Sequence, residues 1–131
     1  MKKPFLLVLT LMSFALAQLT VAHWQMPLAK PTAQDVARLK TLEKAYAAAK
    51  VALAKSPKSE KAKKDFTGIG AAYGHETMMS PVLTDRTVKY PQALRIFREV
   101  LKVDPNEPTA KQESEMIIRI YKMLHKPIPK A

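Results

Sequence analysis

Apolar residues recur every three or four positions through most of the chain beyond residue 32, and prolines fall between the periodic stretches. Such spacing places apolar side chains on one face of a helix, so the pattern predicts helices. A first helix is expected to begin at Thr32, because this residue and Asp35 have the spacing of a capping box, and to stop at Pro57. A second helix is expected over about 59–79.

The second half of the chain contains two further periodic stretches. Residues 82–90 are expected to form a long extended loop, and a third helix to begin at Pro91, since proline is well tolerated in the first turn of a helix. After a turn at 104–108, Thr109 is expected to cap a fourth helix. The apolar stripe of this fourth helix would consist of Met116, Ile117, Ile120, Tyr121 and Leu124.

Composition supports a helical fold. The chain has only three glycines, which favours helices over a sheet. It has no cysteine, and this absence excludes disulfides, thiolate metal sites and a cysteine nucleophile. The predicted fold class is all-α, with about four helices in antiparallel hairpins and a long inserted loop. This domain is expected to span residues 32–125, and residues 126–131 to form a loose tail.

The N-terminus has the features of a secretory signal peptide. Two lysines are followed by an apolar run over 5–17, and a small-x-small pattern ends at Ala17. Cleavage is expected after Ala17, with Ala22 as the alternative, and residues 18–31 would form an extended lead-in. A retained membrane anchor is the other interpretation, but polar residues dilute the apolar run. The chain is therefore expected to be periplasmic or secreted.

An internal repeat becomes visible when the chain is shifted by 48 residues. The aligned pairs are Ala45 with Ala93, Leu53 with Leu101, Pro57 with Pro105, Ala62 with Ala110, Ile69 with Ile117, and Tyr73 with Tyr121. The register extends across a helix, a proline turn and the next helix, and repeats of this kind are typical of stacked helical hairpins.

Residues 66–73 resemble the first helix of the tetratricopeptide repeat, W-x2-L-G-x2-Y, with Phe for Trp and Ile for Leu. Ala93, Phe97 and Pro105 match the A-x3-F and later proline of its second helix. The chain departs from the family by about eleven extra residues before Ala93 and by incomplete flanking units. The residues that would pack the repeat are Phe66, Ile69, Gly70, Tyr73, Ala93, Phe97, Leu101, Pro105, Ile117 and Tyr121.

The resemblance implies a function in binding. Tetratricopeptide-like domains generally bind extended peptides or partner proteins in a groove lined by the first helix of each repeat. Carried onto this chain, the groove would display Lys64, Thr67, Ala71, Gly74, Arg119 and Lys122. Because this set is basic, an acidic peptide or a carboxylate terminus is the expected partner. The lysine–asparagine arrangement of the carboxylate-clamp members is not reproduced.

Charge suggests a second class of function. The formal net charge is +11, and removal of a signal peptide with its two lysines leaves 20 basic and 11 acidic side chains, or +9. Such a charge favours encounters with an anionic envelope polymer, lipid or nucleic acid. The basic run Lys55, Lys58, Lys61, Lys63 and Lys64 has no interleaved aromatic residues, so specific nucleic-acid recognition is not expected.

The sequence has little of the chemistry of an enzyme. No nucleophile elbow or phosphate-binding loop is present, and the three histidines are far apart. We therefore expect no catalysis and no cofactor. One minor alternative is a copper site, in which His75, Met78 and Met79 would meet on one side of the second helix. Methionines at helical spacing more commonly fill a core.

Overall fold

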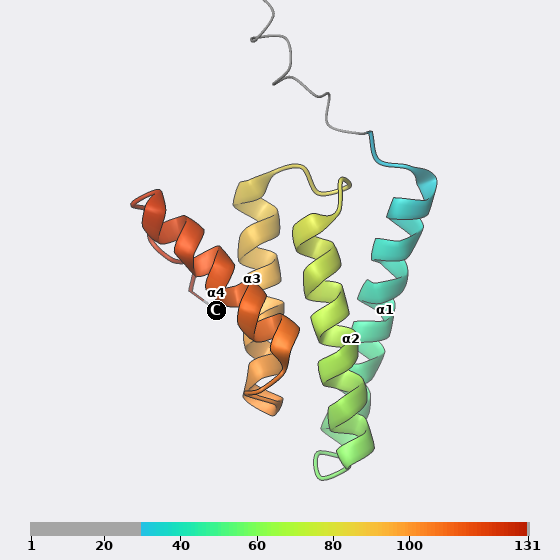
Figure 1. The fold of residues 1–131 in the computed structure, drawn as a ribbon. Coiled ribbons are helices and arrows are strands. Elements are labelled where there is room, and N and C mark those ends of the chain that lie inside the picture. Colours follow the sequence, from blue (N-terminus) through green and yellow to red (C-terminus); the bar gives the residue numbers. More distant parts are fainter. Residues whose placement is uncertain (1–29, 131) are drawn as a thin grey trace, which may run out of the picture.

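The computed structural model describes residues 30–130, and this part of the chain is all-α, as predicted. Its helices are α1 (Ala33–Lys55), α2 (Glu60–Met79), α3 (Arg86–Val103) and α4 (Pro108–Met123). The first three helices lie side by side with successive helices antiparallel, and α4 lies obliquely across α3 (Figure 1). The predicted signal peptide, both of its cleavage sites and nearly all of the predicted lead-in lie outside the described residues.

The first two helices begin where local hydrogen bonds satisfy free backbone N–H groups. The Thr32 hydroxyl accepts a hydrogen bond from the Asp35 backbone N–H (3.1 Å), and the Asp35 carboxylate accepts one from the Thr32 N–H (2.8 Å). This is the predicted capping box. Ser59 caps α2 in a similar way, through the N–H of Ala62 at 3.2 Å.

The third helix begins one turn earlier than predicted. Asp85 caps it by accepting hydrogen bonds from the backbone N–H (2.8 Å) and the hydroxyl (2.7 Å) of Thr87. Pro91 therefore lies inside α3 instead of opening it, and the prediction of an extended segment is wrong over 86–90. The Asp85 cap supports this extra turn, although proline removes one helical hydrogen bond. The loop between α2 and α3 shortens to residues 80–85.

The predicted cap of the fourth helix is also wrong. Glu107 caps α4 through the backbone N–H of Ala110 (2.5 Å), and Pro108 occupies the first turn. Thr109 lies within the helix. A glutamate can replace the usual short cap because its longer side chain reaches the same N–H. Pro108 at the first position has no N–H of its own that needs an acceptor.

The described tail folds back onto the domain. His125 has a left-handed backbone conformation (φ 51°), which reverses the chain after α4. The Lys126 N–H then donates to the Tyr121 carbonyl (3.0 Å), and the Arg98 guanidinium donates to the Pro129 carbonyl (2.6 Å). The tail, which the sequence predicts to be loose, is thus held against α3 and α4.

Two clusters of buried side chains hold the helices together. One centres on α3 and comprises Met78, Ala93, Leu94, Phe97, Val100, Ala110 and Ile117; the other comprises Tyr46, Ala49, Phe66, Tyr73 and Ile96. Most of the predicted repeat-packing residues are fully buried here, Ile69, Leu101 and Tyr121 are partly buried, and Pro105 is exposed in a turn.

Two glycines let α2 approach its neighbours closely. A Cβ atom on Gly70 would lie 2.5 Å from a methyl group of Val100, and one on Gly74 would lie 2.3 Å from the ring of Phe97. Larger side chains at either position would hold the helices apart. Within residues 30–130, no helix combines the length and the apolar character that crossing a membrane requires.

Candidate functional site

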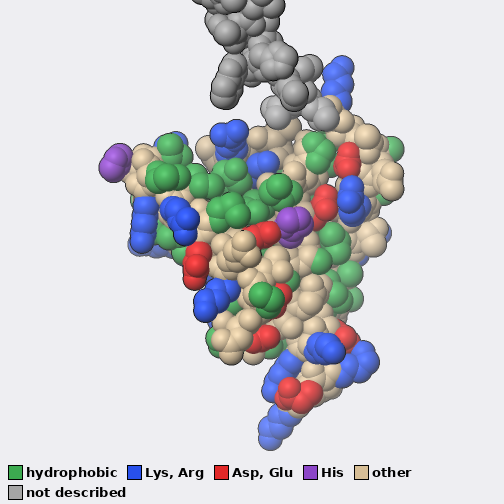
Figure 2. All heavy atoms as spheres, in the orientation of Figure 1, with side chains coloured by type: hydrophobic (Ala, Val, Ile, Leu, Met, Phe, Trp, Pro, Cys, Tyr) green, Lys and Arg blue, Asp and Glu red, His purple; other side chains and the backbone are tan. Residues whose placement is uncertain are grey.

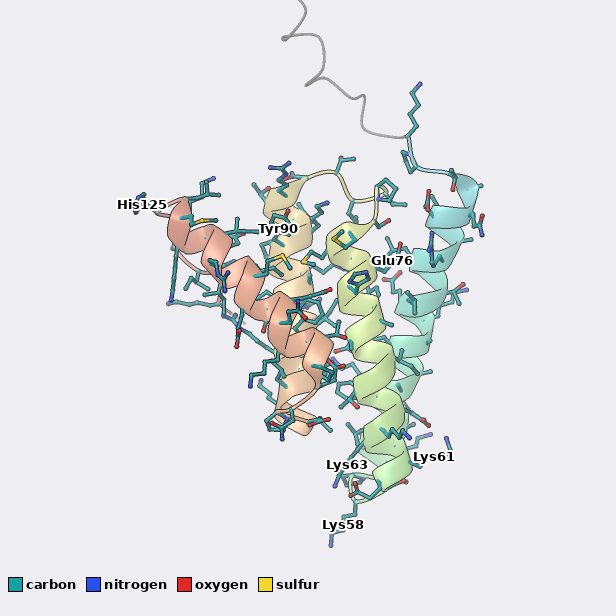
Figure 3. All side chains as sticks on the ribbon, viewed as in Figure 1. Lys58, Lys61, Lys63, Glu76, Tyr90 and His125 are labelled. Carbon is teal, nitrogen blue, oxygen red and sulfur yellow. The ribbon has the colours of Figure 1, made fainter. Side chains whose placement is uncertain are left out.

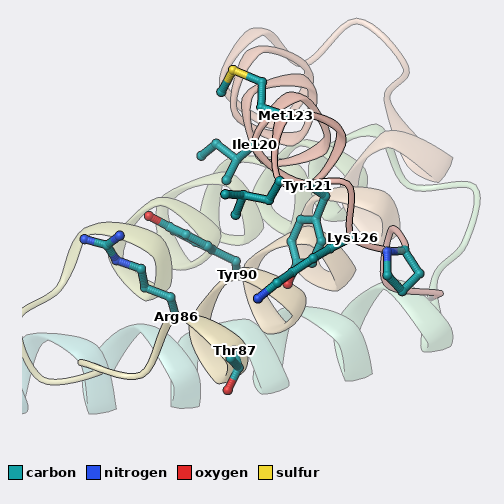
Figure 4. Close-up of a pocket in the computed structure, with 9 residues that line it drawn as sticks. Arg86, Thr87, Tyr90, Ile120, Tyr121, Met123 and Lys126 are labelled. Atoms are coloured by element: carbon teal, nitrogen blue, oxygen red, sulfur yellow. The ribbon is translucent and has the colours of Figure 1, made fainter.

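A hollow of about 660 Å³ lies between the start of α3 and the end of α4. Figure 4 shows Ile120 and Met123 of α4 on one side of it, and Arg86 and Tyr90 of α3 on the other. This volume lies in the range of ligand-binding clefts. The hollow, called here the α3–α4 hollow, is lined by Arg86, Thr87, Tyr90, Ile120, Tyr121, Met123, Leu124, Lys126 and Pro127.

The hollow stays open because α4 packs with only part of its apolar surface. Ala110, Ser114 and Ile117 are buried in the interface with the rest of the domain. Met116 and Leu124, which belong to the predicted apolar stripe, are exposed. Along residues 30–130 there is no further helix to cover them, so only part of the predicted apolar stripe is buried.

The walls of the hollow belong to two strongly basic segments. Residues 86–98 and 116–130 contain no aspartate or glutamate. None of their lysines and arginines forms an ion pair with a carboxylate of the described chain. Figure 2 shows hydrophobic side chains gathered over the start of α3 and the end of α4, with Lys and Arg side chains beside them. The eight cations are Arg86, Lys89, Arg95, Arg98, Arg119, Lys122, Lys126 and Lys130.

The groove predicted from the sequence is not open along α2. Thr67 and Ala71 are only 7% and 5% exposed, and Gly74 faces the ring of Phe97. These three positions are buried because α2 packs against both α3 and α4. Arg119 and Lys122 are exposed on α4. Lys64 is exposed as well and borders a separate, polar hollow of about 330 Å³ with Glu60, Lys63, Thr67, Val103 and Asp104.

The possible copper ligands occupy three different environments. Nδ1 of His75 lies 2.5 Å from a carboxylate oxygen of Glu113, a contact that joins α2 to α4. Met78 is only 4% exposed and packs in the core, whereas Met79 points into solvent. The structure therefore does not bring the three side chains to one site. In the described part of the chain, no three His, Cys, Asp or Glu residues are grouped to hold a metal ion.

A polar cluster on α1 and α3 was not predicted. The Glu99 carboxylate accepts hydrogen bonds from the Tyr46 hydroxyl (2.7 Å) and from Lys50 (2.6 Å). Burial alone would raise the pKa of Glu99, but these hydrogen bonds outweigh it and lower the pKa below its ordinary value. Burial and the neighbouring carboxylate raise the pKa of Tyr46. Because Glu99 of α3 accepts hydrogen bonds from two residues of α1, the cluster ties the two helices together.

The basic run around the α1–α2 turn is partly neutralised. Lys61 pairs with Asp65 (2.5 Å) and Lys63 with Glu60 (2.8 Å). Figure 3 shows Lys58 at the opposite end of the molecule from Tyr90, so this run is separate from the α3–α4 hollow. The hollow thus differs from the lysine run in combining an apolar floor with unpaired cations.

Comparisons with protein-family models, curated proteins and solved structures gave no match to this chain.

Proposed function

We propose that this protein is an exported, non-catalytic interaction module that binds an acidic protein or peptide partner at the α3–α4 hollow. One observation carries the proposal: an apolar hollow, lined by Arg86 and Lys126 and by no acidic residue, lies between two segments that contain no acid. Apolar surface left open beside a polar rim is typical of a binding site. The surrounding positive charge accelerates encounters with an acidic partner and disfavours basic ones.

The resemblance to tetratricopeptide-repeat proteins supports a binding role, since that family is built for protein interactions. The site proposed here differs from the groove of that family. It lies at the end of the helical stack, and only Arg119 and Lys122 of the expected groove residues belong to its basic segments. The apolar residues of the hollow supply binding free energy, and the cations select the partner.

Site-specific cross-linking in cells that express the full chain tests this proposal. A photoreactive amino acid replaces Met123, which lines the hollow and is 66% exposed. The matched control replaces Met79, which is 62% exposed on α2 and does not line the hollow. We expect one acidic protein, identified by mass spectrometry, to be cross-linked from position 123 and not from position 79, and to remain associated at high salt.

The alternative function is charge-driven binding of an anionic envelope polymer, lipid or nucleic acid, which the formal charge of +11 favours. Binding of this kind weakens steeply with salt and depends little on which cations are removed. Equal products from positions 123 and 79, together with loss of all association at high salt, would support this alternative and contradict the interaction module.

A further inference from the structure

Exposed and partly buried apolar residues of α4 and of its C-cap, Leu124, form a stripe with helical spacing. Met116, Ile120, Met123 and Leu124 occupy positions i, i+4, i+7 and i+8, and they continue into the α3–α4 hollow. From Met116 to Leu124 the stripe spans eight helical steps, or about 12 Å at the rise of an α-helix. Resting on the function proposed above, we infer that the partner presents an amphipathic α-helix, with acidic residues flanking its apolar face, along this stripe.

Backbone hydrogen bonding favours a helix over an extended peptide. An extended segment usually docks by adding a strand to the edge of a sheet, where its N–H and C=O groups find partners. In residues 30–130 no strand exists to offer such an edge. A bound helix satisfies its own backbone groups, so it can lie on an apolar surface without unpaired polar atoms. Helices also pack by fitting the side-chain ridges of one into the grooves of another, which suits the stripe on α4.

The charges around the hollow define where the acids of this helix should lie. Figure 4 shows Arg86 on the α3 side, with Ile120 and Met123 facing it from α4, and the Lys126 side chain extending beside Tyr121. Lys126 is held in place because its backbone N–H bonds to the Tyr121 carbonyl. Cations thus border the apolar floor, and carboxylates on the flanks of a bound helix can reach them. The occupant is therefore apolar on one face and acidic beside it.

A second copy of this chain is a poorer occupant. Its first helix, α1, has exposed Val36 and Val51, but it carries five basic residues against two acidic ones. Docking α1 of one copy on the basic end of another would bring like charges together. The charge around the hollow therefore favours an acidic partner over self-association.

A titration with three synthetic peptides tests the inference on protein purified from cells that express the full chain. The first peptide is built from leucine, alanine and glutamate, with leucines at i, i+3, i+4 and i+7 and glutamates on the flanks. The second has the same composition without helical spacing, and the third replaces glutamate with lysine. Amide chemical shifts of Tyr90, Ile120 and Met123 report binding at the hollow, and M123E and M79E are the matched variants.

We expect the first peptide to bind at least tenfold more tightly than the second, the third not to bind, and M123E but not M79E to abolish binding. Equal binding of the first two peptides, lost in M123E, would overturn the helical partner while leaving the proposed function intact. Self-association that competes with the peptides and disappears in M123E would identify a second copy and overturn the inference. Absence of any peptide binding would also overturn it, and cross-linking from position 123 then decides the proposed function independently.

Discussion

Replacing Gly74 with alanine tests the close packing of α2 on α3. The added Cβ would lie 2.3 Å from Cε1 of Phe97, whereas ordinary contacts begin at 3.4 Å, so the ring or the helix must move by about 1 Å. Phe97 is fully buried, and close packing in protein interiors leaves little room for such a ring to move. Overpacking of this kind costs about 1–3 kcal/mol. Alanine itself gains about 1 kcal/mol over glycine in a helix, which offsets part of the loss.

Gly68→Ala is the matched control, because Gly68 lies on the same helix with nothing within 4 Å of its added Cβ. Both variants share the gain in helix propensity, so the difference between them isolates the cost of the contact. We expect G74A to be less stable than G68A by about 1–3 kcal/mol. Urea unfolding followed by circular dichroism measures this difference, provided that both variants have the same m-value. If the two variants unfold within about 0.3 kcal/mol of each other, the close approach of the helices at Gly74 is refuted.

Two further predictions concern polar contacts. The pKa of Glu99 is lowered in the folded state, so its contribution to stability is present above its ordinary value of 4.5 and disappears as the pH falls through the lowered value. Glu99→Gln should therefore lower the free energy of unfolding at pH 7 and have little effect in strongly acidic buffer, and an equal loss in both would contradict this assignment. Arg98→Ala removes the hydrogen bond to Pro129, so the Lys126 amide hydrogen, which bonds to the Tyr121 carbonyl in the folded tail, should exchange with solvent several-fold faster than in the control Arg95→Ala. Unchanged amide exchange would show that Arg98 does not hold the tail.

The helices could be predicted where their determinants are local. Thr32 with Asp35, and Ser59 before α2, act on residues three positions away, so the sequence alone identifies them. Pro91 was misleading because proline indicates where a helix can begin, but it does not prevent a cap farther back from starting the helix earlier. The choice between Pro91 and Asp85 depends on hydrogen bonds that only the structure shows.

The candidate site was less predictable because it depends on how the helices pack. Periodicity identifies the apolar face of α4, but it does not show whether another helix covers Met116 and Leu124. Small residues such as Ala71 and Gly74 suit an open groove and a close helix contact equally well, and the structure shows the second. The pairing of Tyr46 with Glu99 joins residues 53 positions apart, so no local spacing indicates it. One usable signal was overlooked: the complete absence of acids from 86–98 and 116–130.

The proline inside α3 has a consequence for the motion of the α3–α4 hollow. Pro91 has no N–H, so the carbonyl group of Thr87 receives no helical hydrogen bond from it. The turn 86–90 is therefore attached to the rest of α3 by one bond fewer, and local opening needs the least free energy where such bonds are missing. Because Arg86, Thr87 and Tyr90 lie on this turn, one wall of the hollow can rearrange while the core around Phe97 stays folded. The hollow thereby combines one wall that can rearrange with a core that stays folded, so the shape of the proposed site can adjust to its acidic partner.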